Sequence, residues 1–207
     1  MIKNILFDMG GVVFRQDTEQ AFSRFRHSGV DPDKFMGIYG QRGFFLDVET
    51  GAITADEFCR AMSTEAGHEV TWAEAQYCWL GFMTSVPPEG LQRLLELKER
   101  YHVCLLSNTN PFIMAHQHSN SFSGDGHPID HYFHSLFLSY EMKAYKPDRR
   151  IFDLAMQADG MRPEECIFVD DSQKNIDAAN ALGLHGLHVP TNQDWRAALD
   201  EMLQQLS

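Results

Sequence analysis

Helical and strand-like segments alternate through the second half of this chain. Helical spacing of apolar residues marks "PPEGLQRLLELKERY" (residues 87–101), "PDRRIFDLAMQADG" (147–160) and "SQKNIDAANALG" (172–183). Between and after them lie the short apolar runs "HVCLLSN", "HSLFLSY", "CIFVDD" and "LHGLHV". This alternation predicts βαβ units, and therefore an α/β fold with a parallel sheet.

Polar residues stand where the predicted strands end. Asp8 closes the apolar run "ILF" near the N-terminus, Ser107 and Asn108 follow the run that begins at residue 102, and Asp170 and Asp171 close "CIFV". In open α/β sheets, ligands bind at the carboxyl ends of the strands. These five residues are therefore predicted to meet at one edge of the sheet.

The strand pattern fades between Phe14 and Val86. Two capping boxes, "TADE" (54–57) and "TWAE" (71–74), each precede a segment with spaced apolar residues, which is typical of helix starts. We predict that residues 15–87 form a small helical cap inserted after the first strand. Residues 1–14 and 88–207 would then form the core.

Composition limits the class of ligand. The 207 residues include 17 Lys and Arg against 29 Asp and Glu, and the net charge of −12 argues against binding nucleic acid or an anionic membrane. A small anionic substrate remains compatible if a metal or a local cation offsets that charge. The four cysteines form no C-x-x-C pair, and no apolar run is long enough for a membrane span, so we expect a cytoplasmic protein with reduced thiols. Oligomeric state is not indicated.

Four short motifs follow one another in a fixed order: "FDMGG", "LLSNT", "YKPDRRIF" and "IFVDDSQKN". Together they resemble the haloacid dehalogenase (HAD) superfamily, whose members share a Rossmann-like three-layer core and often a helical cap after the first motif. Within it, they are most similar to bacterial α-glucose-1-phosphate phosphatases and to the phosphatase domain of soluble epoxide hydrolase. The resemblance covers most of the chain and implies a phosphatase.

The resemblance implies a nucleophile and a metal site. Asp8 would attack phosphorus and form an aspartyl-phosphate, which splits one difficult displacement into two easier ones. Mg²⁺ would offset the negative charges of the Asp8 carboxylate and the substrate phosphate as they approach each other. Its implied ligands are the Asp8 carboxylate, the backbone carbonyl of Gly10 and Asp171, with Asp170 as a neighbouring or water-bridged partner.

The remaining motif residues are implied to bind phosphate. Lys146 would neutralise the phosphate and the nucleophile as a compact charge. Ser107 and Asn108, with nearby backbone N–H groups, would hold phosphoryl oxygens. Asn175 is expected to orient Lys146 or the acids.

Gly10 departs from the family pattern, because most family phosphatases carry there an Asp that protonates the leaving group and activates water. Without that Asp, the enzyme loses general acid/base catalysis worth roughly 10²–10⁴-fold in rate. The proton transfers would fall to solvent or to a residue of the cap, with Asp17 or a cap histidine as candidates. We expect slow turnover that favours good leaving groups, such as anomeric or phenolic oxygens.

Three functions fit these residues. The first is a Mg²⁺-dependent phosphatase acting on a small phosphorylated metabolite, most simply a sugar phosphate. The second is a haloacid dehalogenase, which also lacks the second Asp but needs no metal and hence no paired Asp170 and Asp171. The third is a regulatory protein that binds phosphate with little turnover, for which Gly10 is the main support.

Two other groups of residues are candidates for binding. Phe44, Phe45, Trp72 and Trp79 could line a substrate pocket, although aromatic residues of a small helical segment more often form its core. A histidine-rich stretch between residues 116 and 134 could form a zinc site if its last three histidines shared a helical face. Its Gly, Ser, Asn and Pro content favours a polar surface loop instead. The stretch contains His116, His118, His127, His131 and His134.

Overall fold

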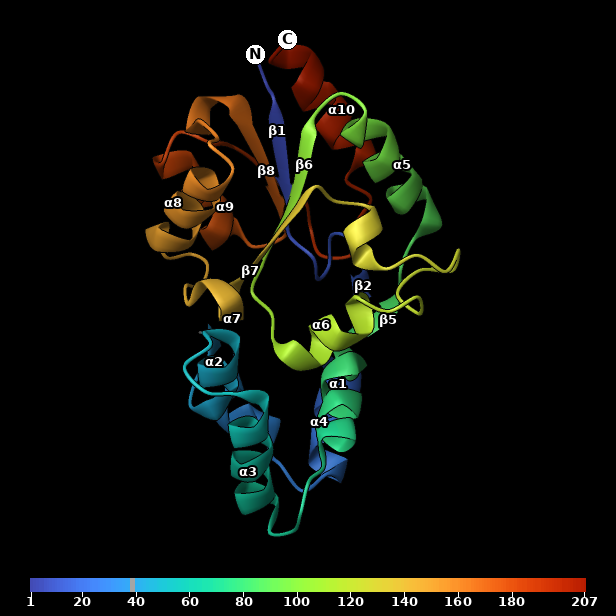
Figure 1. Cartoon of the computed structure of the whole chain (residues 1–207), viewed down its shortest axis with the longest axis vertical. Helices are drawn as coiled ribbons and strands as arrows, with labels where there is room; N and C mark the ends of the chain where they lie inside the picture. The colour runs from blue at the N-terminus through green and yellow to red at the C-terminus, as the bar shows by residue number, and fades with distance from the viewer. Residues whose placement is uncertain (38–39) are drawn as a thin grey trace.

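The computed structural model describes residues 1–37 and 40–207 and contains a five-stranded parallel sheet. The strand order is β7-β6-β1-β8-β9, and every neighbouring pair is parallel (Figure 1). This confirms the predicted α/β class. The strands are β1 (Asn4–Phe7), β6 (His102–Ser107), β7 (Ser135–Leu138), β8 (Cys166–Asp170) and β9 (His185–His188).

The register of the central strands aligns their carboxyl ends. Phe7 of β1 lies opposite Leu105 of β6 on one side and Val169 of β8 on the other. The chain leaves β1 for β6 and β7, then returns to the other side of β1 for β8 and β9. Such a reversal of strand order is where open α/β sheets bind ligands.

Helices cover both faces of the sheet and make a three-layer core (Figure 1). Alternate residues of β1 point to opposite faces: Ile5 and Phe7 belong to one apolar cluster, and Leu6 belongs to the other. The first cluster includes residues of α5 (Pro88–Lys98) and α10 (Arg196–Gln205); the second includes residues of α8 (Arg149–Ala158) and α9 (Gln173–Ala181). The predicted layering of the core is confirmed.

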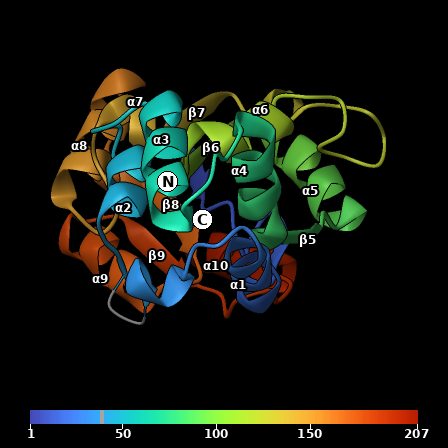
Figure 2. The ribbon, with the colours of Figure 1, turned by 90° about the horizontal axis from the view of Figure 1, so that it is seen from below.

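A helical segment lies beyond the carboxyl ends of the strands, and Figure 2 views the molecule from that side. It contains α1 (Thr18–His27), α2 (Phe44–Glu49), α3 (Ala55–Ala66) and α4 (Trp72–Trp79), with the two-residue strands β3 (Met36–Gly37) and β4 (Gly40–Gln41). The chain enters it through β2 (Arg15–Gln16) and leaves it through β5 (Met83–Ser85), which pair antiparallel. The exact domain boundaries stay a prediction.

Helix caps and aromatic packing explain this segment. Both predicted capping boxes are present: Thr54 with Glu57 at α3, and Thr71 with Glu74 at α4. The core of the segment is aromatic, with ring centroids of Phe25, Phe45, Phe58 and Trp79 between 5.0 and 5.7 Å apart in the contacting pairs.

Short elements complete the fold. The helices α6 (Pro111–Gln117) and α7 (Ser139–Met142) follow β6 and β7, and single 3-10 turns occupy 32–34, 80–82, 129–131 and 163–165. The histidine-rich stretch is mostly loop, so its last three histidines share no helix; the rings of His127 and His131 stack at 4.1 Å, and His118 pairs with Asp130. No helix in the part of the chain that the structure describes could cross a membrane.

Candidate active site

The predicted site residues meet at the carboxyl edge of the sheet. A cavity of about 190 Å³ lies between this edge and the helical segment. Seven of the eight predicted residues line it, and the eighth, Asp170, lies buried directly behind them, in contact with Lys146. The seven are Asp8, Gly10, Ser107, Asn108, Lys146, Asp171 and Asn175.

Lys146 is the positive centre of the site. Its Nζ lies 2.7 Å from Asp8 Oδ1 and 2.7 Å from Asp170 Oδ2, and its side chain is only 1% exposed. Burial alone would lower the pKa of Lys146, but the attraction of Asp170 and Asp8 outweighs it, so the pKa is raised. Lys146 therefore remains charged at neutral pH.

Asp170 is held by three neighbours and is fully buried. Besides Lys146, the Asn175 amide donates to its two oxygens at 3.0 and 3.1 Å, and the backbone N–H of Ser172 donates at 2.7 Å. Asn175 thus orients an acid, one of the two roles considered for it from the sequence. Asp170 in turn positions Lys146.

Asp171 faces the cavity from the other side. It accepts a hydrogen bond from Thr191 Oγ1 at 2.6 Å and one from the Gln16 amide at 3.4 Å. Asp8, Asp170 and Asp171 can each place one oxygen within 4.8 Å of the others. Clustered carboxylate oxygens are the donors that Mg²⁺ prefers.

The electrostatics of this cluster call for a cation. Burial raises the pKa of Asp8 to about 7; Lys146 opposes the shift, and Asp170 and Asp171 add to it. Burial also raises the pKa of Asp171, with Asp170 contributing. Among the described residues that line the cavity, Lys146 is the only one with a positive charge. A divalent cation among these oxygens would offset the repulsion.

The two glycines after the nucleophile motif differ in what they require. Gly11 has φ +74°, and a Cβ there would lie 2.5 Å from Asp171 Oδ2, so a larger residue would strain the backbone and displace the Asp171 carboxylate. Gly10 lies outside the left-handed region, and a Cβ there would meet Gln16 Oε1 at 2.9 Å. The Gln16 amide therefore occupies the space beside Gly10.

The helical segment contributes residues that the sequence motifs did not identify. Gln41, Glu49, Trp79 and Phe82 line the cavity opposite the sheet edge, and Tyr145 lines it from the core. Of the four aromatic residues considered from the sequence, only Trp79 is among the lining residues, and it also belongs to the aromatic core.

Glu49 is a buried carboxylate, 4% exposed, at the end of α2. Burial raises its pKa to about 7, although hydrogen bonds with Gln41, Tyr145 and Asn110 act in the opposite direction. No motif marks this residue in the sequence. The turn residues Thr50 and Gly51, which follow α2, are the only local hint of its position.

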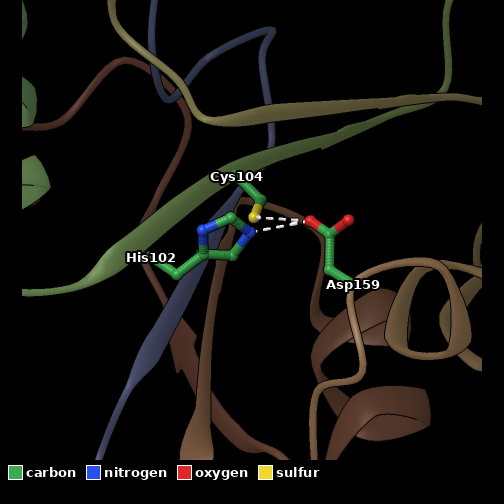
Figure 3. Close-up of side chains that lie close together, drawn as sticks. All are labelled: His102, Cys104 and Asp159. Carbon is green, nitrogen blue, oxygen red and sulfur yellow. Dashed lines mark hydrogen bonds and ion pairs between the residues drawn. The ribbon is translucent and has the colours of Figure 1, made fainter.

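A second group of polar residues lies at the opposite end of β6 (Figure 3). His102 Nε2 is 2.7 Å from Asp159 Oδ2, and Cys104 Sγ is 3.9 Å from the same oxygen. Burial and the nearby Asp159 raise the pKa of the Cys104 thiol, so it stays protonated. The group joins β6 to the end of α8 and lies away from the cavity, which is lined by Ser107 at the other end of the strand.

Comparisons with known proteins agree with this geometry. The family model for haloacid dehalogenase-like hydrolases matches residues 2–183. A D-ribitol-5-phosphate phosphatase of Bacteroides thetaiotaomicron is 39% identical over 204 residues, which cover 98% of this chain and 99% of that protein.

Two solved structures are also similar. A HAD-like hydrolase of Porphyromonas gingivalis gives a TM-score of 0.94 at 33% identity, covering 99% of this chain and 98% of that one. A HAD enzyme of Bacteroides thetaiotaomicron, crystallised with magnesium and inorganic phosphate, gives a TM-score of 0.86 at 34% identity. The match covers 96% of this chain and 99% of that one. The fold and the acid-lysine site thus define a hydrolase with a Rossmann-like core. The chain belongs to the haloacid dehalogenase-like hydrolase family.

Proposed function

We propose that this enzyme is a Mg²⁺-dependent phosphatase that hydrolyses a small phosphorylated metabolite, a sugar phosphate or sugar-alcohol phosphate. The observation that carries the proposal is Lys146 Nζ at 2.7 Å from both Asp8 and Asp170, beside Asp171 in one cavity. The relative that acts on D-ribitol 5-phosphate and the related structure with magnesium and phosphate support the substrate class and the metal.

Asp8 is the proposed nucleophile. It follows β1 directly, and the backbone N–H of Asp8 donates to the Val169 carbonyl at 2.8 Å, which fixes the base of the side chain. Attack by a carboxylate oxygen on phosphorus would expel the alcohol and form an aspartyl-phosphate, and water would then release phosphate. Lys146 holds the carboxylate through Oδ1 and balances part of the charge of the approaching phosphate.

Asp8, the Gly10 carbonyl and Asp171 are the proposed Mg²⁺ ligands. Asp170 is already engaged by Lys146, Asn175 and Ser172, so it serves better as a partner behind the metal than as a direct ligand. Bound Mg²⁺ would supply positive charge to the phosphoryl oxygens.

Ser107 is the proposed phosphate-binding hydroxyl. It ends β6 and lines the cavity, although the whole residue is only 1% exposed. Phosphate binding by Asn108 also stays a proposal, to be carried by its backbone, since its side chain is paired with the backbone of Lys146.

The two other functions fit the site less well. A dehalogenase needs no metal, and it would gain nothing from three clustered carboxylates, of which two contact Lys146. A regulatory protein without turnover would have no use for a nucleophile held 2.7 Å from Lys146.

A phosphate-release assay tests the proposal. Wild-type protein is incubated with sugar phosphates, sugar-alcohol phosphates and 2-chloropropionate, with and without Mg²⁺. We expect Mg²⁺-dependent phosphate release, no chloride release, and loss of turnover in Asp8→Asn with an unchanged circular dichroism spectrum. Chloride release, or binding of phosphate esters without hydrolysis, would establish one of the alternatives.

A further inference from the structure

Glu49 has a place in the cavity that the proposed mechanism leaves without a role. Among the described residues that line the cavity, the carboxylates are Asp8, Asp171 and Glu49. Asp8 and Asp171 lie at the sheet edge, where the proposed mechanism uses them to attack phosphorus and to bind Mg²⁺. Glu49 comes from α2 and lies on the cap side of the cavity, where the alcohol part of a phosphate ester must extend from Asp8.

The core holds Glu49 in place from several directions. Tyr145 OH donates to Glu49 Oε2 at 3.1 Å, and the Asn110 amide lies 3.5 Å from Oε1. Ser139 Oγ donates to the Glu49 backbone carbonyl at 2.6 Å. Tyr145 also precedes Lys146 directly, so the position of Glu49 is tied to the phosphate-binding machinery.

Close packing fixes the end of α2 as well. Figure 1 shows α2 next to α7, and a Cβ on Gly51 would lie only 2.0 Å from the carbonyl oxygen of Tyr140. The chain can therefore approach α7 only with glycine at this position. Glu49 thus belongs to a close-packed contact between cap and core, which favours a single position for its carboxyl group.

The other candidates for proton transfer do not reach the cavity. The Asp17 carboxylate accepts from Gln20 N as the N-cap of α1 and is exposed. The cap histidines His27 and His68 are exposed and bond to backbone carbonyls. Gln16 fills the space beside Gly10, but an amide neither gives nor takes a proton near neutral pH.

We propose that Glu49 is the acid/base catalyst of this enzyme and takes the role that Gly10 cannot perform. The inference rests on the phosphatase function proposed above. As Asp8 bonds to phosphorus and the bond from phosphorus to the ester oxygen breaks, the Glu49 carboxyl gives its proton to that oxygen. The resulting carboxylate then takes a proton from water as the water oxygen attacks phosphorus, the bond to Asp8 breaks, and phosphate leaves.

Protonation matches this cycle. Burial brings the pKa of Glu49 to about 7, so both the acid and the base form are accessible near neutrality. A Glu carboxyl group at its usual pKa would be ionised near neutral pH and would have no proton to give to the leaving oxygen. Asp8 thus attacks phosphorus from the sheet edge, and Glu49 transfers protons from the cap side of the cavity.

The test compares Glu49→Gln with wild type on two substrates, a sugar-alcohol phosphate and p-nitrophenyl phosphate, by stopped flow in excess Mg²⁺. Asp47→Asn is the matched control, because it removes a carboxylate from the same helix outside the cavity. Glu49→Asp keeps a carboxyl group and tests whether that group is what matters. Circular dichroism and thermal melting verify the fold of each variant.

We expect Glu49→Gln to slow alcohol release from the sugar-alcohol ester by roughly 10²–10⁴-fold, because an alkoxide needs a proton to leave. First-turnover release of p-nitrophenol should fall less than about tenfold, followed by slow later turnovers and therefore a burst. Glu49→Asp should recover part of the lost rate, and Asp47→Asn should match wild type.

Equal losses in the first-turnover release of the two alcohols, or no loss, would overturn the proposal. Equal losses would mean that Glu49 only binds substrate or holds the cap. Glu49→Asp behaving no better than Glu49→Gln would also count against it. A wild-type protein that releases no phosphate from either ester would instead refute the phosphatase function itself, so the two failures can be told apart.

Discussion

The side-chain amide of Asn108 pairs with the backbone of Lys146 in both directions. Asn108 Oδ1 accepts from Lys146 N at 2.8 Å, and Asn108 Nδ2 donates to Lys146 O at 3.0 Å. The loop after β6 thus fixes the backbone from which the Lys146 ammonium reaches both acids. Asn108, which follows the proposed phosphate-binding residue Ser107, therefore positions the lysine.

Asn108→Ala should reduce kcat through misplacement of the lysine. A displacement of about 1 Å costs up to roughly 10²-fold in rate. Steady-state kinetics should show kcat falling by about that factor, and the melting temperature should also fall, because the backbone N–H and carbonyl of Lys146 lose their partner. Asn180→Ala, which removes an amide of α9 that accepts from Gly186 N outside the site, is a control for amide loss. Wild-type kcat in Asn108→Ala would show that the pairing is dispensable.

Removal of the metal should abolish turnover. Three clustered carboxylates with one lysine are short of positive charge for a phosphate dianion. Dialysis against EDTA should eliminate phosphate release, and Mg²⁺ should restore it. Asp171→Asn removes a proposed direct ligand, so its half-maximal rate should need at least the roughly 10–100-fold more Mg²⁺ that loss of an outer-shell partner costs. Asp177→Asn, exposed on α9, should need no more than wild type. Full activity in EDTA after verified metal removal would contradict the metal role.

Gly11→Ala should disturb the proposed metal site as well as lower the free energy of unfolding. Gly11 and Gly67 have nearly the same φ, +74° and +75°, but a Cβ meets Asp171 at 2.5 Å in the first and nothing within 4 Å in the second. Each substitution should cost about 1–2 kcal/mol of unfolding free energy from the left-handed backbone. Only Gly11→Ala should also lose Mg²⁺-dependent turnover. Similar activities for the two variants would show that the approach to Asp171 is unimportant.

Gly10→Asp should be tolerated and should supply an acid at the position usual in the family. The backbone there is not left-handed, and the group that must move is the end of the flexible Gln16 side chain. In the Glu49→Gln background it should raise turnover of the sugar-alcohol ester by about tenfold or more, within the range of acid/base help. Stopped-flow measurement of alcohol release checks this. A folded double variant with no gain would mean that proton transfer does not limit Glu49→Gln.

Glu49 should make stability depend on pH. Its pKa is about 7 in the folded protein, against about 4.5 in the unfolded chain, so the folded state holds the proton more tightly between these values. The free energy of unfolding should therefore fall as pH rises from about 4.5 to 7, by at most about 3 kcal/mol from this group. Glu49→Gln lacks this fall, so it should gain stability relative to wild type between pH 5 and pH 8. Urea unfolding of both proteins at the two pH values measures the difference, and an unchanged difference would contradict the raised pKa.

The sheet edge of the site was predictable because Asp8, Ser107 and Asp170 stand at the ends of apolar strands. Asp8, Ser107 and Asp170 had to meet once the strands were parallel and adjacent. The apolar runs beside these three residues and the order of the motifs are enough to predict their positions. The α/β class with a parallel sheet followed from the alternation of helices and strands, whereas the Rossmann-like core followed from the resemblance to the HAD superfamily.

The cap side of the cavity was not predictable from local patterns. Glu49 reaches the cavity because α2 packs on α7, about 90 residues further along the chain, and such a contact leaves no trace in the spacing of residues around it. Gln16 was missed for a similar reason, because it occupies the space that a side chain at position 10 would fill. The protonation of Glu49 depends on burial, which appears only when the helical segment meets the core.

The level ends of β1, β6 and β8 also determine which changes in chain length this protein can survive. A one-residue insertion or deletion in a strand moves its side chains to the opposite face. In β1 it would bring Leu6 into the cluster of Ile5 and would turn Asp8 away from Lys146. Length variation among descendants of this gene should therefore be absent from the three strands. It should accumulate in exposed loop segments such as residues 124–127, which pair with no strand.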